Sequence, residues 1–248
     1  MILKRKTSGL LIIGNEILSG KTIDTNSNFI SKELAKRGVD TKEISIIPDA
    51  EDIIVLKLKE FSKKFDYVFT SGGIGPTHDD ITAASVAKAF KKKLVLNENA
   101  KVLLEKHYEY NSLTSARLKM ALLPKDSKLI NNPVSVAPGF NLENVYVFPG
   151  VPDILKVMFL EFVDNLFDEK ILPQKTISTT LAEGVIGTFV GKVQKEHIEV
   201  EIGSYPYFKN NSFGVSLVIK SEDIEKLELV CKKLFRYLEK NNGKPKYF

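Results

Sequence analysis

Short buried strands alternate with amphipathic helices along the first two thirds of this chain. The apolar run GLLIIG at 9–14 is typical of a buried strand, and a helix pattern follows with Phe29, Ile30 and Leu34 on one face. The strand patterns VDTKEISIIP and YVFT continue the alternation, with a helix bearing Ile53, Leu56 and Phe61 between them and another helix beginning near Ile81. This βαβαβα order implies right-handed crossovers and predicts a parallel sheet with helices on both faces.

The last third of the chain has a different pattern. After helix patterns at about 98–110 and 112–122 and a helix at 152–167, strand patterns occur in PQKTISTTLAEG, HIEVEIGSYPYF and SFGVSLVIKS. Helix patterns at about 186–195 and 221–240 complete this part. We therefore predict two domains: an α/β domain at 1–172, with a doubly wound, mostly parallel sheet in three layers, and a smaller α+β domain at 173–248.

Composition excludes several classes of protein. The 248 residues are 43% hydrophobic, and no apolar run approaches the ~20 residues of a membrane span. The N-terminal segment lacks the pattern of a signal peptide, and Cys231 has no second cysteine with which to form a disulfide. We expect a cytoplasmic protein with Cys231 in or near a core. The net charge of +5 comes mostly from scattered lysines, so no nucleic-acid partner is expected.

The stretch GNEILSGKT at 14–22 superficially matches a phosphate-binding P-loop. Gly14 and Gly20 are separated by five residues, whereas the P-loop pattern has four. The bulky side chains of Ile17 and Leu18 also do not suit a loop of converging backbone N–H groups. A nucleotide triphosphatase of this type is therefore not expected.

The loop TSGGIGPTHDDIT at 70–82 carries the strongest chemical signal. It follows a buried strand and opens a helix. Gly72, Gly73 and Gly75 allow positive φ and close backbone approach, and Pro76 stiffens the exit from the turn. Several backbone N–H groups can then face one oxyanion beside a helix N-terminus, which predicts a phosphate or pyrophosphate site.

Two carboxylates, Asp79 and Asp80, follow this predicted anion site. Acids beside an anion repel it unless a cation lies between them, so the pair indicates a divalent metal ion. The alternative is that one aspartate caps the helix while the glycines form a turn. His78 stands where a dinucleotide-binding fingerprint has its third glycine, and it either contacts phosphate or is an exposed loop histidine.

Four motifs in order resemble the CinA-like (competence/damage-inducible protein A) family: GNEILSG, DTNSNFISKELAKRG, SGGIGPTHDDIT and NNPVSVAPGF…FPGVP. The resemblance implies a main domain with the molybdopterin-binding fold. The glycine loop is also similar to that of the hydrolase domain of eukaryotic FAD synthases, and EIGSYP at 201–206 resembles the small KH-like domain of the family. Longer members continue into a nicotinamide-mononucleotide deamidase domain. This sequence reaches Phe248 without one, so deamidase activity is not expected.

The resemblance also implies roles for residues of the first two motifs. Asn15 and Glu16 would lie at the same sheet edge as the glycine loop, and Asp24 and Asn26 would lie near the ligand. Glu16 could equally cap its own loop, and Asp24 could be only a helix cap. The family often has aspartate at position 15, so the asparagine of this chain leaves the number of metal ions open.

Further positions resemble those of molybdopterin adenylyltransferases. Asp80 matches the aspartate after their glycine loop, Thr82 matches a hydroxyl two residues on, and Asp49 matches an acid after a strand. Asp49 is also a good helix N-cap. Asn132 and Ser135 lie between stiffening prolines and suit a ribose or heterocycle edge, although a structural turn uses the same residue types.

Our leading hypothesis is a metal-dependent hydrolase that splits nucleotide pyrophosphates such as ADP-ribose or FAD into AMP and a second monophosphate. Asp80 and Asp79 would be catalytic, and Asp80, Asp79 and Asp49 would bind Mg²⁺, Mn²⁺ or Co²⁺, with K⁺ as a further ion that the resemblance implies. The predicted substrate-binding residues are Asn15, Glu16, Asp24, Asn26, Gly72, Gly73, Gly75, Pro76, Thr77, Thr82, Asn132 and Ser135.

Two other functions are compatible with the same sequence. One is a molybdopterin-binding protein or adenylyltransferase of cofactor biosynthesis, which would use the same loop. The other is RNA binding through GVIG at 184–187, a GxxG form, but a strand pattern precedes it and basic flanks are absent. The resemblance also implies a homo-oligomer.

Overall fold

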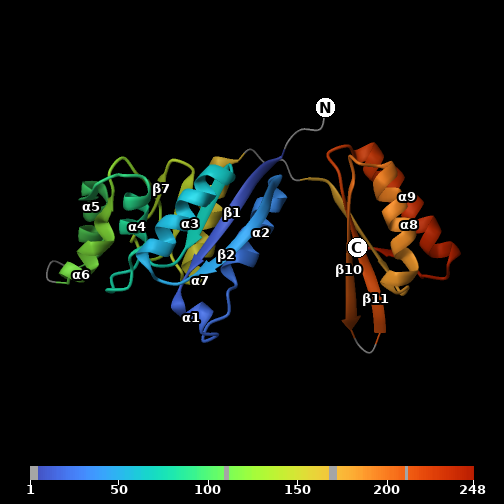
Figure 1. Cartoon of the computed structure of the whole chain (residues 1–248), viewed down its shortest axis with the longest axis horizontal. Helices are drawn as coiled ribbons and strands as arrows, with labels where there is room; N and C mark the ends of the chain where they lie inside the picture. The colour runs from blue at the N-terminus through green and yellow to red at the C-terminus, as the bar shows by residue number, and fades with distance from the viewer. Residues whose placement is uncertain (1–4, 109–111, 168–171, 210–211) are drawn as a thin grey trace. The chain divides into compact units, whose positions relative to one another are not determined.

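The computed structural model describes residues 5–108, 112–167, 172–209 and 212–248 (Figure 1). The described residues form two compact units, one ending at Phe167 and the other starting at Leu172. The domain boundary predicted between 172 and 173 therefore lies at the start of the second unit. No helix in these described ranges is long and apolar enough to cross a membrane.

The first unit is built on a six-stranded sheet with the order β2-β1-β3-β8-β7-β6. Its strands are β1 (Lys6–Ile13), β2 (Val39–Ile47), β3 (Tyr67–Ser71), β6 (Lys128–Ile130), β7 (Gly139–Leu142) and β8 (Val145–Phe148). The pairs from β2 to β8 are parallel, and β7 is antiparallel to both of its neighbours. The predicted, mostly parallel sheet is confirmed.

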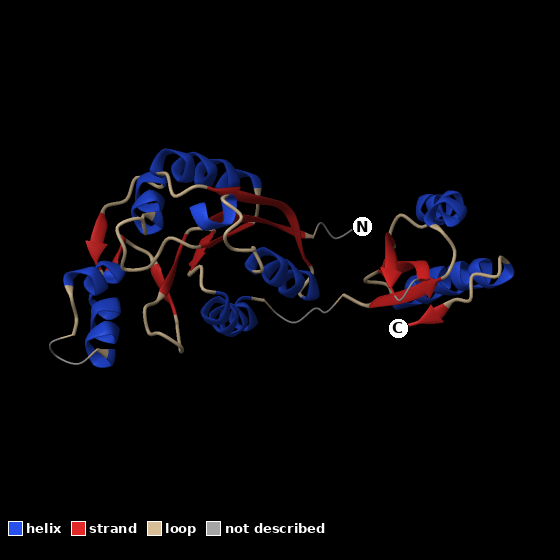
Figure 2. Ribbon diagram, turned by 90° about the horizontal axis from the view of Figure 1, so that it is seen from below, coloured by secondary structure: helices blue, strands red, loops and turns tan. Residues whose placement is uncertain are grey.

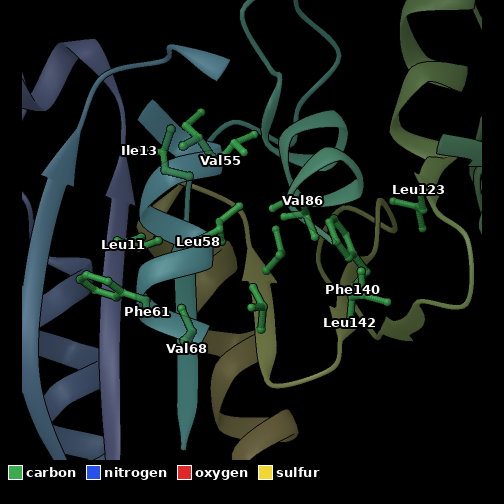
Figure 3. Packing of buried hydrophobic residues seen from close by; sticks show 14 of the residues in the cluster. Leu11, Ile13, Val55, Leu58, Phe61, Val68, Val86, Leu123, Phe140 and Leu142 are labelled. Carbon is green, nitrogen blue, oxygen red and sulfur yellow. The ribbon is translucent and has the colours of Figure 1, made fainter. Parts of the chain in front are cut away.

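Helices cover both faces of this sheet, as Figure 2 shows. The helices of this unit are α1 (Asn15–Leu18), α2 (Asn26–Lys36), α3 (Glu51–Lys64), α4 (Thr82–Ala89), α5 (Glu98–His107), α6 (Ser115–Leu118) and α7 (Pro152–Leu166). Of these, α2 and α7 pack on one face of the sheet, and α3 and α4 pack on the other. Successive side chains of a strand point to opposite faces of the sheet, so the core has two halves. Leu10 and Phe69 pack with α2 and α7. Leu11 and Val68 pack with α3 and α4 (Figure 3). The three-layer architecture is confirmed.

Two details of the predicted helices are wrong. Leu56, expected on the buried face of α3, is 65% exposed, and Ile54 and Leu58 are buried instead. The helix expected at 112–122 is only α6, which continues as a 3-10 turn (Lys119–Ala121) into strand β5 (Leu122–Pro124). This strand pairs with β4 (Leu94–Leu96), and a long-range pairing of such short strands leaves no local pattern to read. The predicted end of the preceding helix, at 109–110, lies outside the described residues.

The second unit is a four-stranded antiparallel sheet with both of its helices on one face (Figure 1). Its elements are β9 (Gln174–Thr179), α8 (Glu183–Glu196), β10 (Glu201–Lys209), β11 (Ser212–Lys220), α9 (Ile224–Lys240) and β12 (Lys246–Tyr247). Cys231 of α9 is fully buried in the core between helices and sheet, where burial raises the pKa of its thiol to about 11. This confirms Cys231 as a core residue.

The GVIG stretch lies inside α8 rather than in a loop. A GxxG element that clamps a nucleic-acid backbone must be a loop between two helices. Gly184 and Gly187 have helical neighbours on both sides, so the structure does not support RNA binding through this motif.

Candidate functional site

The strand order places a crevice at the carboxyl ends of the central strands. From β1 the chain goes first to β2 on one side and then to β3 on the other, and ligands of open α/β sheets bind where the order reverses in this way. The segments that follow these strands begin at Gly14 after β1, Pro48 after β2, Gly72 after β3 and Pro149 after β8. The sequence motifs are therefore gathered at one edge of the sheet.

The first two glycines of the loop cannot be replaced without strain. Gly72 has φ 109°, and a Cβ there would lie 2.1 Å from the carbonyl oxygen of Ile13. Gly73 has φ 69°, and its Cβ would lie 2.2 Å from Oγ1 of Thr82. Thr82 itself is 0% exposed and donates its hydroxyl to the Gly72 carbonyl at 3.0 Å. Its observed contact thus holds the loop against α4.

Three consecutive backbone N–H groups of the loop have no acceptor among the described residues. The Gly72 N–H donates to the Phe148 carbonyl at 3.1 Å and ends the β-ladder. The N–H groups of Gly73, Ile74 and Gly75 donate to no other residue of the described chain. Successive free N–H groups in a tight turn form the kind of concavity that binds phosphate oxygens.

The two aspartates are oriented by a threonine of the same loop. One carboxylate oxygen of Asp80 accepts from the Thr77 N–H at 2.7 Å and from its hydroxyl at 2.6 Å. That hydroxyl also lies 2.5 Å from the Asp79 carboxylate and lowers the pKa of Asp79, which is therefore ionised at neutral pH. Gly75 does not have positive φ, but a Cβ there would meet the Asp80 carboxylate at 2.7 Å. His78 is an exposed loop histidine, with its side chain 98% accessible.

The alternative role of these aspartates as helix caps is not observed. The N-cap of α4 is Ile81, and no side chain accepts a capping hydrogen bond there. A cation instead lies beside them: Nζ of Lys119, in the 3-10 turn, donates to the Thr77 carbonyl. Sequence reasoning missed Lys119, because a lysine in a lysine-rich chain, 42 residues from its partner, carries no local signal.

A second group of residues surrounds Asn26 at the start of α2. This side chain is 6% exposed and donates to Ser71 Oγ at 2.9 Å and to the Gly150 carbonyl at 2.8 Å. Its Oδ1 has no hydrogen-bond partner among the described residues. Asp24 precedes Thr25, the N-cap residue of α2, and accepts from the N–H groups of Asn26 and Ser27 in the first turn, each at 3.0 Å.

The segment after β1 is hydrogen-bonded to the segment after β2. The Asp49 carboxylate accepts from the Asn15 N–H at 2.8 Å, and it does not cap α3, whose N-cap is Ala50 without a side-chain bond. The Glu16 carboxylate folds back over Gly14, where a Cβ would lie 2.5 Å from it. Glu16 makes no hydrogen bond to the rest of the described chain through its side chain and is free to contact a ligand.

The second asparagine of the NNPVSVAPGF motif, Asn132, makes its hydrogen bonds within its own loop. Asn132 is 4% exposed, donates to Ser135 Oγ and the Ala137 carbonyl, and accepts from the N–H groups of Val134 and Ser135. Its hydrogen-bonding capacity is thus used internally, which is the structural turn that the sequence left as an alternative. Neither Asn132 nor Ser135 lines the hollows described next.

Two hollows open to solvent adjoin the glycine loop. The apolar hollow is lined by Gly73, Gly75 and Asp80 of the loop, by Lys119, and by apolar side chains that include Leu94 and Phe140. The second hollow, called the polar hollow here, is lined by the polar side chains of Glu16, Thr22, Asp24, Thr25, Asn26 and Ser71, by Gly150, and by the apolar side chains of Ile12, Ile13, Ile17, Ile23 and Pro152. Asp80 is therefore accessible from a crevice, as a catalytic role requires.

The aspartates suit a metal ion that takes few protein ligands. No set of three or more His, Cys, Asp or Glu side chains gathers in the described ranges, so Asp49 does not join Asp79 and Asp80 in one site. The reason is topological: β2 and β3 lie on opposite sides of β1, which separates them by ~10 Å. Two adjacent carboxylates still fit Mg²⁺, which usually takes one or two carboxylates and completes its shell with water and phosphate oxygens.

Comparison with known proteins agrees with this architecture. Residues 9–169 match the family described as "Probable molybdopterin binding domain", and residues 172–245 match "FAD synthase, middle domain". A solved structure, the protein CinA with unknown function from Thermoplasma acidophilum, is 33% identical with a TM-score of 0.62. It covers 66% of this chain and 100% of its own.

Two curated relatives are similar over most of this chain. A probable FAD synthase of Caenorhabditis elegans is 34% identical over 93% of the chain, and a putative competence-damage inducible protein of Clostridium botulinum is 31% identical over 88%. The chain spans only 50% and 55% of the lengths of these relatives. The matches show that the chain belongs to the CinA-like family, with a probable molybdopterin binding domain followed by the middle domain of FAD synthases.

Proposed function

We propose that the protein is a metal-dependent hydrolase of nucleotide pyrophosphates of the ADP-ribose or FAD type. The observation that carries this proposal is the juxtaposition of three unused backbone N–H groups with the paired carboxylates of Asp79 and Asp80. The similarity to FAD synthases supports a nucleotide substrate. Water would attack one phosphorus, and the bridging oxygen would leave with the other phosphate, which gives two monophosphates.

Each part of the loop has a role in this reaction. The N–H groups of Gly73, Ile74 and Gly75 would bind phosphate oxygens and stabilise the charge that develops on them. Asp79 and Asp80 would hold Mg²⁺, Mn²⁺ or Co²⁺, an ion that offsets phosphate charge and acidifies water when bound. Thr77 keeps both carboxylates in position, so the oxygens are placed before the substrate arrives.

A hydrolysis assay with the whole chain tests the proposal. Purified protein with Mg²⁺, Mn²⁺ or Co²⁺ should release AMP from ADP-ribose or FAD, and EDTA should stop the release. Asp80→Asn should lower kcat by about 10²–10³-fold, because the carboxylate charge is lost while the side-chain shape is kept. Asp126→Asn is the matched control, because Asp126 pairs with Lys92 and lines neither hollow. Full turnover by Asp80→Asn would show that Asp80 has no catalytic role.

A second function is molybdopterin binding with adenylyl transfer. The match of residues 9–169 to the molybdopterin-binding family favours it. In that reaction the loop would bind the phosphates of ATP, and molybdopterin would displace pyrophosphate. Release of pyrophosphate from ATP only when molybdopterin is present would identify this activity, whereas AMP release from ADP-ribose or FAD would identify the hydrolase.

A further inference from the structure

We propose that the two hollows bind opposite halves of the substrate: the apolar hollow takes a flat heteroaromatic ring, and the polar hollow takes a sugar. This inference rests on the proposed function, because it assumes a substrate with a diphosphate between two such groups. It adds the orientation of the substrate and the residues that select each half.

The two hollows adjoin different parts of the glycine loop. Ser71, the last residue of β3, lines the polar hollow, whereas Gly73, Ile74 and Gly75 line the apolar hollow. The unused N–H groups of Gly73, Ile74 and Gly75 lie along the segment that follows Ser71. A diphosphate held by these N–H groups would direct its two ester oxygens toward different hollows.

The composition of the apolar hollow suits a ring. Among the described residues that line it, Asp80 and Lys119 have the polar side chains, and the remaining lining residues are apolar or glycine. Leu94 of β4 contributes to this wall and is 39% exposed, so apolar surface there is open to a ligand. Ala83 and Ala84 of α4 also line the hollow, and their small side chains leave room for a ligand. Burial of a planar ring against such walls is favourable, whereas sugar hydroxyls would find no partners there.

The polar hollow instead contains oxygen atoms that lack hydrogen-bond donors. Asn26 Oδ1 is buried there without a hydrogen-bond donor, and leaving such an acceptor unpaired is unfavourable. The amide cannot be turned to relieve this, because its Nδ2 donates to the Gly150 carbonyl, which only accepts. The carboxylate of Glu16 is a second unused acceptor in the same lining. Sugar hydroxyls supply the donors that these oxygens lack, and a bare aromatic ring face does not.

Binding of monophosphates to the whole chain tests the ring assignment without relying on turnover. Leu94→Ser should weaken the binding of AMP or FMN by about tenfold, measured by calorimetry with Mg²⁺ present, because apolar contact with the ring is lost. Ribose 5-phosphate should bind as it does to the wild type. Leu160→Ser is the matched control, because Leu160 is also 39% exposed and lines neither hollow. Weaker binding of AMP alone would identify adenine as the ring that occupies the hollow, and weaker binding of FMN alone would identify isoalloxazine.

A second pair of variants tests the sugar assignment. Glu16→Gln should weaken ribose 5-phosphate binding about fivefold, because a charged acceptor for hydroxyl groups becomes neutral. The control Glu98→Gln, at an exposed position of α5, should leave it unchanged. Ala84→Phe places a large side chain in the lining of the apolar hollow and should repeat the effect of Leu94→Ser. It keeps the ring assignment testable if Leu94→Ser does not fold.

The inference is overturned if the wild type binds neither AMP nor FMN, or if both Leu94→Ser and Ala84→Phe fold and bind both nucleotides as the wild type does. It is also overturned if Glu16→Gln leaves ribose 5-phosphate binding unchanged. Binding that follows the expected pattern without hydrolysis of ADP-ribose or FAD would reject the proposed function and retain the two half-sites.

Discussion

At the scale of single residues, the glycines of the loop differ in what they contribute. Gly72 and Gly20 both have positive φ, but a Cβ at Gly72 would meet the Ile13 carbonyl at 2.1 Å, whereas Gly20 has nothing within 4 Å. The strain of a left-handed backbone is therefore common to both positions, and the steric clash belongs to Gly72 alone. A comparison of the two separates backbone preference from close packing.

We expect Gly72→Ala to lower the free energy of unfolding by ~3 kcal/mol or more, because strain and overpacking add. Gly20→Ala should cost ~1 kcal/mol, from strain alone. Urea denaturation of the two variants measures both values. Equal losses would mean that the contact between the loop and β1 does not constrain residue 72.

A second residue-scale expectation concerns Lys119, which holds the loop through the Thr77 carbonyl. Lys119→Met should lower kcat/KM for ADP-ribose or FAD about tenfold. The site loses a cation and the hydrogen bond to the Thr77 carbonyl, whereas methionine keeps the apolar stem of the lysine side chain. Lys119→Arg should retain most of the activity. The control is Lys88→Met, since Lys88 pairs with Glu51 on the surface and lines neither hollow. An unchanged kcat/KM for Lys119→Met would remove Lys119 from the site.

At the scale of elements, Asp66 anchors the start of β1 to the turn before β3. Its carboxylate accepts from Lys6 Nζ at 2.7 Å and from the N–H and hydroxyl of Thr7 at 2.9 and 3.0 Å. The hydrogen bond from Lys6 is the largest cause that lowers the pKa of Asp66 from 3.8 to about 2. Because the pKa is lower in the folded state, the stabilisation is complete above about pH 4 and is lost as the pH falls through about 2.

Asp66→Asn should therefore reduce stability at pH 7 by ~1 kcal/mol, a value discounted for the exposure of this carboxylate. The difference from the wild type should shrink below pH 4 and be mostly lost near pH 2. Urea unfolding at a series of pH values between 2 and 7 measures it. A difference that stays constant with pH would show that the ionised carboxylate is not the source of the stabilisation.

Helix α8 carries glycines at exposed positions where a methyl group meets nothing. Gly187 and Gly191 have no heavy atom within 4 Å of an added Cβ, and both lie inside the helix. Alanine at either position should stabilise the second unit by ~0.5–1 kcal/mol, because glycine is a poor helix former. Thermal unfolding tests this, and destabilisation by Gly187→Ala would mean that residues 184–187 need a non-helical conformation.

At the scale of the whole molecule, the chain has separate cores in its two units. The core of the second unit consists only of residues from 177 to 238, and the cores of the first unit include none of them. We expect residues 172–248 expressed alone to unfold cooperatively and to give a dispersed amide NMR spectrum. An unfolded 172–248 fragment would show that the second unit needs the rest of the chain.

Residues 1–167 should keep the hydrolase activity, because every residue assigned to the site lies there. The homo-oligomer implied by the family resemblance stays a prediction.

Local signals in the sequence determined the succession of elements, the parallel sheet and the glycine loop, because strand and helix periodicity and glycine chemistry act over a few residues. Only the tertiary structure decided which side chains meet. Strand order separates Asp49 from Asp80, a distant turn brings Lys119 to Thr77, and Thr82 turns inward. These outcomes depend on contacts between segments far apart in the chain, whose pairing is set by packing of the whole core rather than by any local pattern.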